Sequence, residues 1–440
     1  MKNKDYNYSY FYSLKIEGIS CFKDSQLLNL SSSENYSQWT IILGDNGTGK
    51  TTLIRVLDRM KPDTSFNVDL SKYDITFLNK KNYFPYFFYG GLENEYKKDL
   101  LSELQLKKIK LDLELFNIKS KSKFNVKIDT VENRNTIYNE DFSSVFLLSY
   151  GASRKMSKSQ NLRTSVSKFS SSLFDDSIEL INAEEWFLQK EWAVLKSVRK
   201  TKSKFENEFN FVKNLLIDIL PDVEDIVSKT VDENNSKPKI EVKTPYGWVN
   251  IRDLSYGYQT ITALLVDIAA NMLEKYPESD NPLAEPVIIL IDEIDLHLHP
   301  KWQRNLIEKL SYHFPKAQFI VTAHSPLIVQ AAQDKNANIV VCRKEGDKVV
   351  IDNNPESVKG WRIDQILTSD LFEVESSQSI KIEEIRKEKI NILLKEKLDS
   401  ADKNRLKIIN EKLNNVPIFS NKESIDAESL IRKAAELLKK

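Results

Sequence analysis

The chain has 440 residues, and its 64 Lys and Arg are balanced by 64 Asp and Glu, so its formal net charge is zero. This balance excludes a strong overall attraction to nucleic acid or to an acidic membrane, and any such contact would need a local patch. The two cysteines, Cys21 and Cys342, lie far apart in sequence, which excludes a disulfide-framed secreted scaffold and a cysteine-based zinc cluster.

The start of the chain is polar and aromatic, and it lacks the apolar stretch of a secretory signal. Strongly apolar runs such as 287–291 fall far short of the roughly 18–20 residues that span a bilayer. We therefore expect a soluble, cytoplasmic protein with no membrane contact.

Glycine is rare and concentrated in one place. Of 11 glycines, Gly44, Gly47 and Gly49 fall within six positions. The apolar run 40–43 before them predicts a strand, and the helical spacing of apolar residues in 51–60 predicts a helix after them. Because glycine serves where the backbone approaches another group closely or takes a positive φ, this strand–loop–helix unit is the first candidate for a binding site.

Further elements follow from apolar periodicity. The sequence predicts strands at 14–17, 109–115, 124–128 and 145–148, helices at 183–204, 205–220 and 257–273, and hairpins at 239–252 and 339–351. Two continuous apolar runs, 287–291 and 319–322, are typical of strands buried on both faces of a parallel sheet. From 371 onward, apolar stripes such as Leu406, Ile409 and Leu413 predict an amphipathic helical tail. Together these elements predict an α/β fold.

The glycine cluster carries a phosphate-binding motif. Residues 44–51, GDNGTGKT, match GxxxxGK[ST] in its required context between a strand and a helix. Backbone N–H groups at the helix start surround phosphates, Lys50 reaches the β- and γ-phosphates, and Thr51 offers a hydroxyl to Mg²⁺. The predicted ATP-binding residues of this loop are Asn46, Gly47, Thr48, Gly49, Lys50, Thr51 and Thr52.

An acidic pair ends the apolar run 287–291. Asp292 is placed to enter the Mg²⁺ shell together with Thr51, and Glu293 to orient or deprotonate the attacking water. We predict Glu293 as a catalytic residue and Asp292 as a metal ligand.

The segment 254–259, LSYGYQ, places Ser255 and Gly257 at the start of a helix, a geometry suited to anions. It resembles the LSxGxQ signature of ABC-type ATPases. The resemblance implies that Ser255, Gly257 and Gln259 contact the γ-phosphate held by a second copy, so that ATP is sandwiched in a head-to-tail dimer.

All four histidines lie between positions 297 and 324. His324 ends the strand that follows Asp292 and resembles the switch histidine of the same superfamily, so we predict a catalytic role for it. His297 and His299 could be metal ligands, but we favour the subunit-contact loop that the family calls its D-loop.

Four segments indicate a particular group within this superfamily, namely LSYGYQ, IDEIDLHLHPKWQR, TAHSPLIVQ and GWRIDQILTSDLF. They look like compact SMC-like ATPases of bacterial defence, closest to the ATPases of Septu anti-phage systems, which also accompany some retrons. The resemblance implies a partner HNH-type nuclease and, if linked to a retron, a reverse transcriptase with its RNA–DNA product. No D-x-D pair of the kind a TOPRIM nuclease needs occurs in the sequence, so we expect no intrinsic nuclease.

The resemblance implies an ABC-type P-loop head with four regions. These are an N-terminal ATPase lobe with an antiparallel β portion at 1–150, a helical insertion at 151–245, a C-terminal ATPase lobe at 246–370 and a helical tail at 371–440. The tail could dock the partner or pack on its own domain.

Two other functions remain open from the sequence. One is a DNA-repair ATPase resembling the SMC and RecF groups, and the other is a scaffold that senses ATP without hydrolysing it. Local nucleic-acid contact could use the aromatic run 83–89 or a basic stretch. We favour core packing or an edge strand for the aromatic run and a solvated loop for the basic stretch. The basic stretch contains Arg154, Lys155, Lys158, Arg163 and Lys168.

Overall fold

This computed structural model describes residues 8–32, 35–60, 110–129, 134–138, 145–157, 172–229, 238–372, 374, 379–395 and 399–413. The chain divides into two compact units, Met1–Phe372 and Glu373–Lys440. The aromatic run 83–89 and the basic residues Lys158, Arg163 and Lys168 lie outside the described residues.

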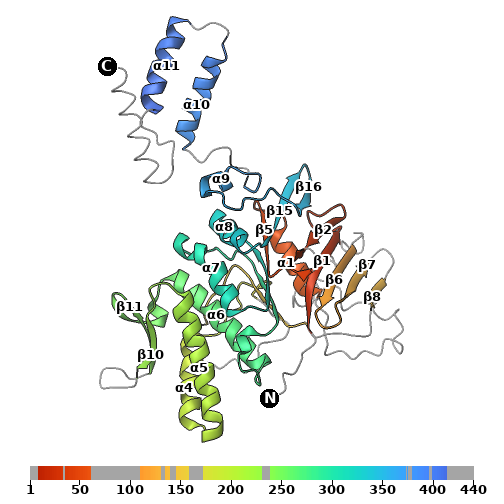
Figure 1. The fold of residues 1–440 in the computed structure, drawn as a ribbon, viewed down its shortest axis with the longest axis vertical. Helices are drawn as coiled ribbons and strands as arrows, with labels where there is room; N and C mark the ends of the chain where they lie inside the picture. The colour runs from red at the N-terminus through yellow and green to blue at the C-terminus, as the bar shows by residue number, and fades with distance from the viewer. Residues whose placement is uncertain are drawn as a thin grey trace, which may run out of the picture. The chain divides into compact units, whose positions relative to one another are not determined.

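A six-stranded sheet in the order β16-β15-β5-β14-β13-β9 forms the centre of the first unit (Figure 1). All neighbouring pairs are parallel except β15 and β16, which form the predicted hairpin. The strands are β5 (Trp39–Gly44), β9 (Leu147–Tyr150), β13 (Val287–Ile291), β14 (Ala317–Thr322), β15 (Asn338–Glu345) and β16 (Lys348–Asp352).

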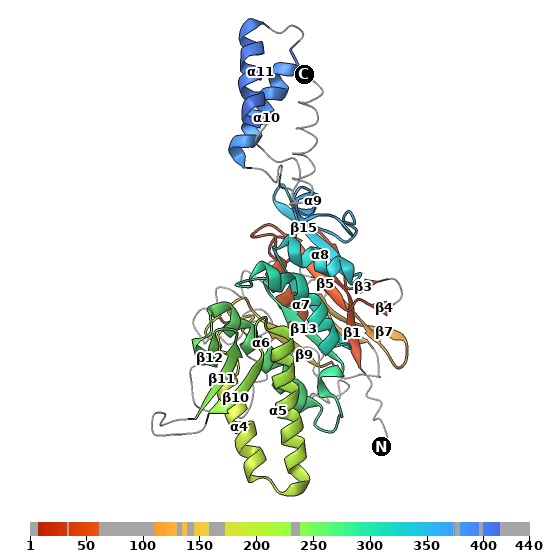
Figure 2. The same cartoon turned by 60° about the vertical axis from the view of Figure 1, so that its left-hand side comes forward.

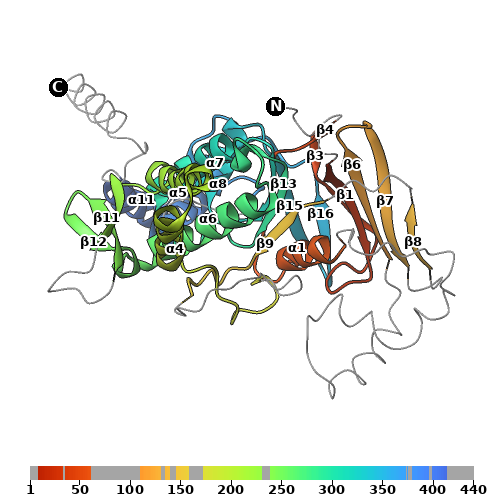
Figure 3. The same ribbon diagram turned by 90° about the horizontal axis from the view of Figure 1, so that it is seen from below.

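The continuous apolar strands have the two buried faces that their sequence predicts. In β13, Ile289 belongs to one hydrophobic core and its neighbours Ile288 and Leu290 belong to the other. Figure 3 shows three helices on one side of the sheet and α1 (Lys50–Arg59) with an antiparallel sheet on the other. The three helices are α6 (Tyr256–Lys275), α7 (Pro300–His313) and α8 (Pro326–Asp334).

The antiparallel sheet has the order β2-β1-β6-β7-β8. Its β6–β7 pair confirms the antiparallel strands predicted from alternating residues, with Leu113 opposite Val126. Its strands are β1 (Ser9–Glu17), β2 (Gln26–Asn29), β6 (Lys110–Asn117), β7 (Ser122–Asp129) and β8 (Arg134–Tyr138), and a short pair, β3 (Ser31–Ser32) and β4 (Asn35–Tyr36), lies beside β1.

Two helices, α4 (Ala183–Lys196) and α5 (Arg199–Ile219), lie side by side (Figure 2). The predicted break at residue 204 is wrong, because the chain turns at Ser197 and Val198, whose backbones are extended. The Ser197 hydroxyl donates to the Ala193 carbonyl and so satisfies a group left free at the end of α4.

A three-stranded meander links α5 to α6 and confirms the predicted hairpin at 239–252. Its strands are β10 (Asp225–Lys229), β11 (Lys239–Thr244) and β12 (Gly247–Asn250), and a 3₁₀ turn at Ile251–Asp253 follows. Another 3₁₀ turn, Pro282–Ala284, precedes β13, and the short helix α9 (Ile363–Leu367) lies near the end of the first unit.

The second unit contains α10 (Ile380–Leu393) and α11 (Ser400–Leu413). Ile392 and Ile409 are buried in it, and Arg405 binds Glu388 through two hydrogen bonds of 2.6 and 2.8 Å. The predicted helical tail is therefore confirmed for these residues. None of the helices in the described ranges has the length and apolar character needed to cross a bilayer.

Candidate nucleotide-binding site

The phosphate loop runs from the end of β5 to the start of α1, as the sequence predicts. Gly44 has φ +138° and Gly49, which caps α1, has φ +81°, values that favour glycine because other residues are strained there. A Cβ atom on Gly44 would lie 2.4 Å from the Cys342 carbonyl oxygen on β15. The loop therefore depends on glycine both for its backbone conformation and for its approach to the sheet.

Lys50 is folded back over this loop. Its side chain is buried, and Nζ donates to the carbonyl oxygens of Gly44 and Asp45, both at 2.8 Å. Burial lowers the pKa of Lys50, while nearby groups including Asp292 and Glu293 partly oppose that shift. Thr48 is also buried and its hydroxyl donates to the Asp45 carbonyl, whereas Asn46 and Gly47 are exposed and Thr51 and Thr52 are half-buried.

A chain of hydrogen bonds joins the phosphate loop to the acidic strand end. The Thr51 hydroxyl donates to Asp292 Oδ2 at 2.8 Å, and the Thr322 hydroxyl donates to Asp292 Oδ1 at 2.6 Å. Asp292 is only 6% exposed, and burying an unpaired carboxylate would cost stability. Both of its oxygens have hydrogen-bond partners. The carboxyl ends of β5, β13 and β14 thus meet at one polar centre.

Glu293 has a positive φ of +49°. Its N–H donates to the Thr322 hydroxyl at 2.7 Å, and its carbonyl oxygen accepts a bond of 2.9 Å from Arg154. Sequence reasoning assigned Arg154 to a solvated basic stretch, but the structure buries it to 3% exposure behind Asp292 and Glu293. Neither Thr322 nor Arg154 was predicted as a site residue.

His324 follows β14 and has an exposed side chain. Its backbone N–H donates to Asp295 Oδ2 at 3.0 Å, so the loop after Glu293 holds the start of the His324 segment. The structure therefore brings the phosphate loop, the acidic pair and the His324 segment together through connected contacts.

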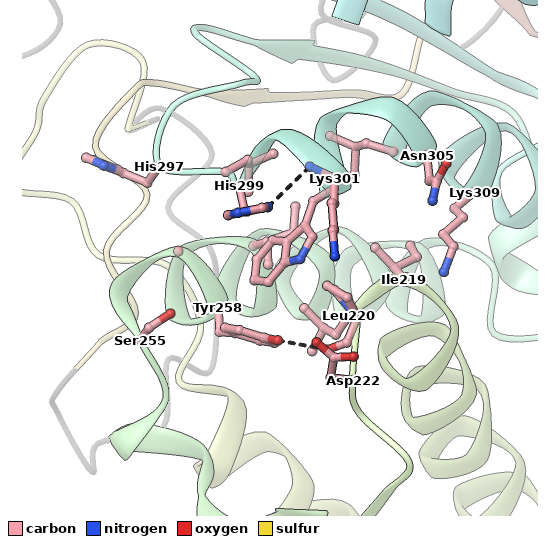
Figure 4. Close-up of a pocket in the computed structure, with 16 residues that line it drawn as sticks. Ile219, Leu220, Asp222, Ser255, Tyr258, His297, His299, Lys301, Asn305 and Lys309 are labelled. Carbon is pink, nitrogen blue, oxygen red and sulfur yellow. Dashed lines mark hydrogen bonds between the residues drawn. The ribbon is translucent and has the colours of Figure 1, made fainter. Parts of the chain in front are cut away.

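The predicted signature lies elsewhere, at the start of α6. Ser255 and Gly257 line a cavity of about 590 Å³ whose other walls include Tyr258, Trp302 and Lys309, and none of its described lining residues comes from the phosphate loop (Figure 4). The Gln259 side chain donates to the carbonyl oxygens of Arg252 and Leu254, both at 2.7 Å. In this chain Gln259 therefore braces its own loop.

Gly257 permits a close contact between α6 and the loop after the acidic pair, since a Cβ there would lie 2.4 Å from the His297 carbonyl oxygen. The two histidines of that loop have separate contacts. The His297 ring packs edge-on against Tyr256 with centroids 4.8 Å apart, and His299 caps α7 by accepting from the Lys301 N–H at 3.3 Å. In the part of the chain that the structure describes, no group of three or more His, Cys, Asp or Glu is placed to hold a metal.

Two bacterial proteins are similar to this chain in sequence. The Septu protein PtuA of Bacillus mycoides (strain KBAB4) is 26% identical over 370 residues, which cover 83% of this chain and 44% of that protein. The retron Ec83 probable ATPase of Escherichia coli is 42% identical over 126 residues, covering 29% of this chain and 22% of that protein. These matches confirm the resemblance to Septu and retron ATPases, although the aligned part spans less than half of either relative.

Among solved structures, the SMC head domain from Thermotoga maritima aligns with a TM-score of 0.39 and 16% identity over 79% of this chain and 99% of that chain. Residues 40–330 match the AAA_21 family, described as "AAA domain, putative AbiEii toxin, Type IV TA system". That match includes the phosphate loop, the acidic pair, the signature segment and His324. Because it covers more than half of the sequence, the chain belongs to the AAA_21 family.

Proposed function

We propose that this chain binds and hydrolyses ATP as the regulatory subunit of a cytoplasmic anti-phage defence complex and controls a separate HNH-type nuclease. The observation that carries the proposal is the Thr51–Asp292–Thr322 chain of hydrogen bonds. It links the phosphate loop, the acidic strand end and the strand before His324, which are the parts that phosphoryl transfer requires in one place.

The residues at the acidic strand end suit Mg²⁺. Thr51 Oγ1 and Asp292 Oδ2 are 2.8 Å apart, and hydroxyl and carboxylate oxygens are the hard ligands that Mg²⁺ takes together with phosphate oxygens and water. Bound there, Mg²⁺ would neutralise charge on the phosphates. Lys50 would exchange its two loop carbonyls for phosphate oxygens, Glu293 would orient the attacking water, and His324 would contact the γ-phosphate.

The signature completes the site from a second copy. Within one chain Ser255 lines a cavity that shares none of its described walls with the phosphate loop. Ser255 is exposed and makes no side-chain capping bond in the described structure, so it is free to meet the nucleotide of another protomer. We therefore propose a head-to-tail dimer or larger assembly closed by ATP.

We infer the partners from the family resemblance. The similarity to a Septu protein and to a retron ATPase supports membership of a defence complex. The motif resemblance described above implies an HNH-type nuclease as the controlled effector and, in a retron, a reverse transcriptase with its RNA–DNA product. The helices α10 and α11 are candidates for the docking of such a partner, because Ile380 and Leu393 on α10 and Leu394 at its C-terminal cap are exposed.

The test is ATP turnover by the full chain with Mg²⁺. We expect Lys50→Ala to abolish hydrolysis through lost phosphate contact, and Glu293→Gln to abolish hydrolysis while retaining bound ATP. Glu308→Gln changes an exposed glutamate on α7 that pairs with Lys335 at 3.4 Å and should behave as the wild type.

Two results would count against this function. A wild-type protein without turnover would exclude an ATPase. A protein that binds DNA in a salt-dependent way without any partner, and leaves the nuclease unaffected, would favour the DNA-repair alternative.

A further inference from the structure

Arg154 is a buried cation in an irregular segment. It follows β9, is 3% exposed, and donates from Nη1 to the carbonyl oxygens of Gly151 at 3.2 Å and Asp292 at 2.7 Å. Its Nη2 donates to the Glu293 carbonyl oxygen at 2.9 Å. Each of these bonds ends on a main-chain carbonyl, and two of them hold consecutive peptide groups of the acidic pair.

Such an arrangement is costly. An arginine is almost never fully buried unless it is paired, because the guanidinium loses its hydration. Burial lowers the pKa of Arg154 to about 10, while the charges of Asp292, Asp295 and Glu293 oppose that shift. The group therefore stays protonated at neutral pH, and its fork of donors is rigid enough to fix several acceptors at once.

The backbone that Arg154 holds is itself strained. Glu293 has φ +49°, a left-handed conformation that costs a non-glycine residue free energy and persists only where its surroundings enforce it. The Glu293 N–H donates to the Thr322 hydroxyl, and the Glu293 carbonyl oxygen accepts from Arg154. Both peptide groups that flank the Glu293 Cα are thus fixed, and with them the direction in which the side chain leaves the backbone.

The segment that carries Arg154 is anchored at both ends. The Gly151 N–H donates to the Ser172 hydroxyl at 3.1 Å. Leu180 accepts from Ser157 at 3.0 Å and donates to Lys155 at 2.8 Å. Arg154 therefore joins a fixed segment, more than a hundred residues away in sequence, to the acidic pair.

We propose that Arg154 is a positioning residue for ATP hydrolysis, whose guanidinium clamps the Asp292–Glu293 backbone so that Asp292 faces Thr51 and Glu293 faces the γ-phosphate. This inference rests on the proposed ATPase function. Because its three hydrogen bonds end on main-chain carbonyl oxygens, Arg154 acts through the acidic pair. Its loss should therefore impair the chemical step much more than the binding of ATP.

The experiment compares Arg154→Met and Arg154→Lys with the wild type in the full chain, measuring kcat, KM, the affinity for ATP and the melting temperature. We expect kcat to fall by about 10- to 100-fold in Arg154→Met, as for a catalytic group displaced by about 1 Å, with KM and ATP affinity within about threefold. Lysine keeps the charge but has one nitrogen for three carbonyls, so it should restore part of kcat.

Arg343→Met is the matched control, because Arg343 also donates to a main-chain carbonyl, that of Asp370 at 2.6 Å, away from the acidic pair. It should leave kcat unchanged. If kcat and ATP affinity of both Arg154 variants fall together with the melting temperature, or if kcat does not change, the inference is wrong. Should Arg154→Met fail to fold, Arg154→Lys alone decides, with a clear fall in kcat at unchanged ATP affinity as the supporting result. A wild-type protein without turnover would overturn the proposed function and this inference with it.

Discussion

Gly47 and Gly49 share a backbone angle of φ +81° but differ in their surroundings. A Cβ on Gly49 would lie 2.5 Å from Cys21 Sγ and 2.7 Å from the Phe22 ring, whereas in the described structure nothing lies within 4 Å of one on Gly47. Both alanine variants bear the left-handed strain, but only Gly49→Ala also overpacks the core. We expect Gly49→Ala to lose about 1–3 kcal/mol more stability than Gly47→Ala, as measured by urea unfolding. Equal losses would contradict this account.

Thr322 and Thr262 form a second matched pair, since both are fully buried. The Thr322 hydroxyl accepts from the Glu293 N–H and donates to Asp292, whereas the Thr262 hydroxyl has no hydrogen-bond partner among the described residues. Valine keeps the shape of threonine and removes the hydroxyl. Thr322→Val should cost about 1–3 kcal/mol by leaving two buried groups unpaired and should also slow hydrolysis.

Thr262→Val is the control for that measurement. Because it removes a buried hydroxyl that has no partner in the described structure, it should leave thermal stability unchanged or raise it. A similar loss in both variants would show that the Thr322 hydrogen bonds do not stabilise the site.

At the scale of elements, α4 carries one buried and one exposed tryptophan. Trp186 is 7% exposed and meets the Phe187 ring edge-on, with centroids 5.2 Å apart, whereas Trp192 is 62% exposed. We expect Trp186→Ala to cost about 3–5 kcal/mol and Trp192→Ala to stay within about 0.5 kcal/mol in denaturant unfolding. The opposite order would mean that α4 packs through its other end.

Elements with a local signal were predictable from the sequence. β5, β13 and β14 are continuous apolar runs buried on both faces, and the β11–β12 hairpin follows from Pro245-Tyr246-Gly247 between two strands. The break between α4 and α5 was misplaced, because the residues at the turn have no proline or glycine signal. There the chain leaves the helix at Ser197, whose hydroxyl bonds back to the Ala193 carbonyl.

Arg154 shows why the rest of the site could not be predicted. It lies 138 residues from Asp292 in sequence, and only the parallel pairing of β9 with β13 brings the two together. A basic residue among other basic residues has the local pattern of a solvated loop, so its burial depends on which strand β9 joins. In the sequence, Thr322 has only the pattern of an ordinary strand end, and its role depends on the pairing of β14 with β13.

At the scale of the whole molecule, the candidate site follows from strand order. β5, β14 and β13 are neighbours and parallel, so the residues after their carboxyl ends, where ligands bind in open α/β sheets, meet at one edge. Lys50, His324 and Asp292 each follow one of these strands. The sequence could therefore assign their motifs to a single site. Ser255 follows a 3₁₀ turn of the meander, and so it falls outside that edge.

This separation leads to a prediction about assembly. If Ser255 completes the nucleotide site of another protomer, Glu293→Gln loaded with Mg²⁺ and ATP should form a dimer or larger species, and the same protein without nucleotide should not. Light scattering after size exclusion measures the mass directly. Adding Ser255→Arg should keep the mass at that of one chain, because the longer side chain takes up the space in which Ser255 would meet the other protomer's nucleotide. Ser255 is exposed, so the variant should still fold.

Tyr312→Arg, also in the Glu293→Gln background, is the control for that change. Tyr312 is 77% exposed on α7 and is not among the described walls of the cavity that Ser255 lines, so this variant should assemble as its parent does. ATP binding must persist in the Ser255→Arg protein, because Lys50 and the phosphate loop are intact. If the nucleotide-loaded Glu293→Gln protein stays a single chain, ATP is held by one copy alone, and the signature serves to brace α6 against the loop around His297.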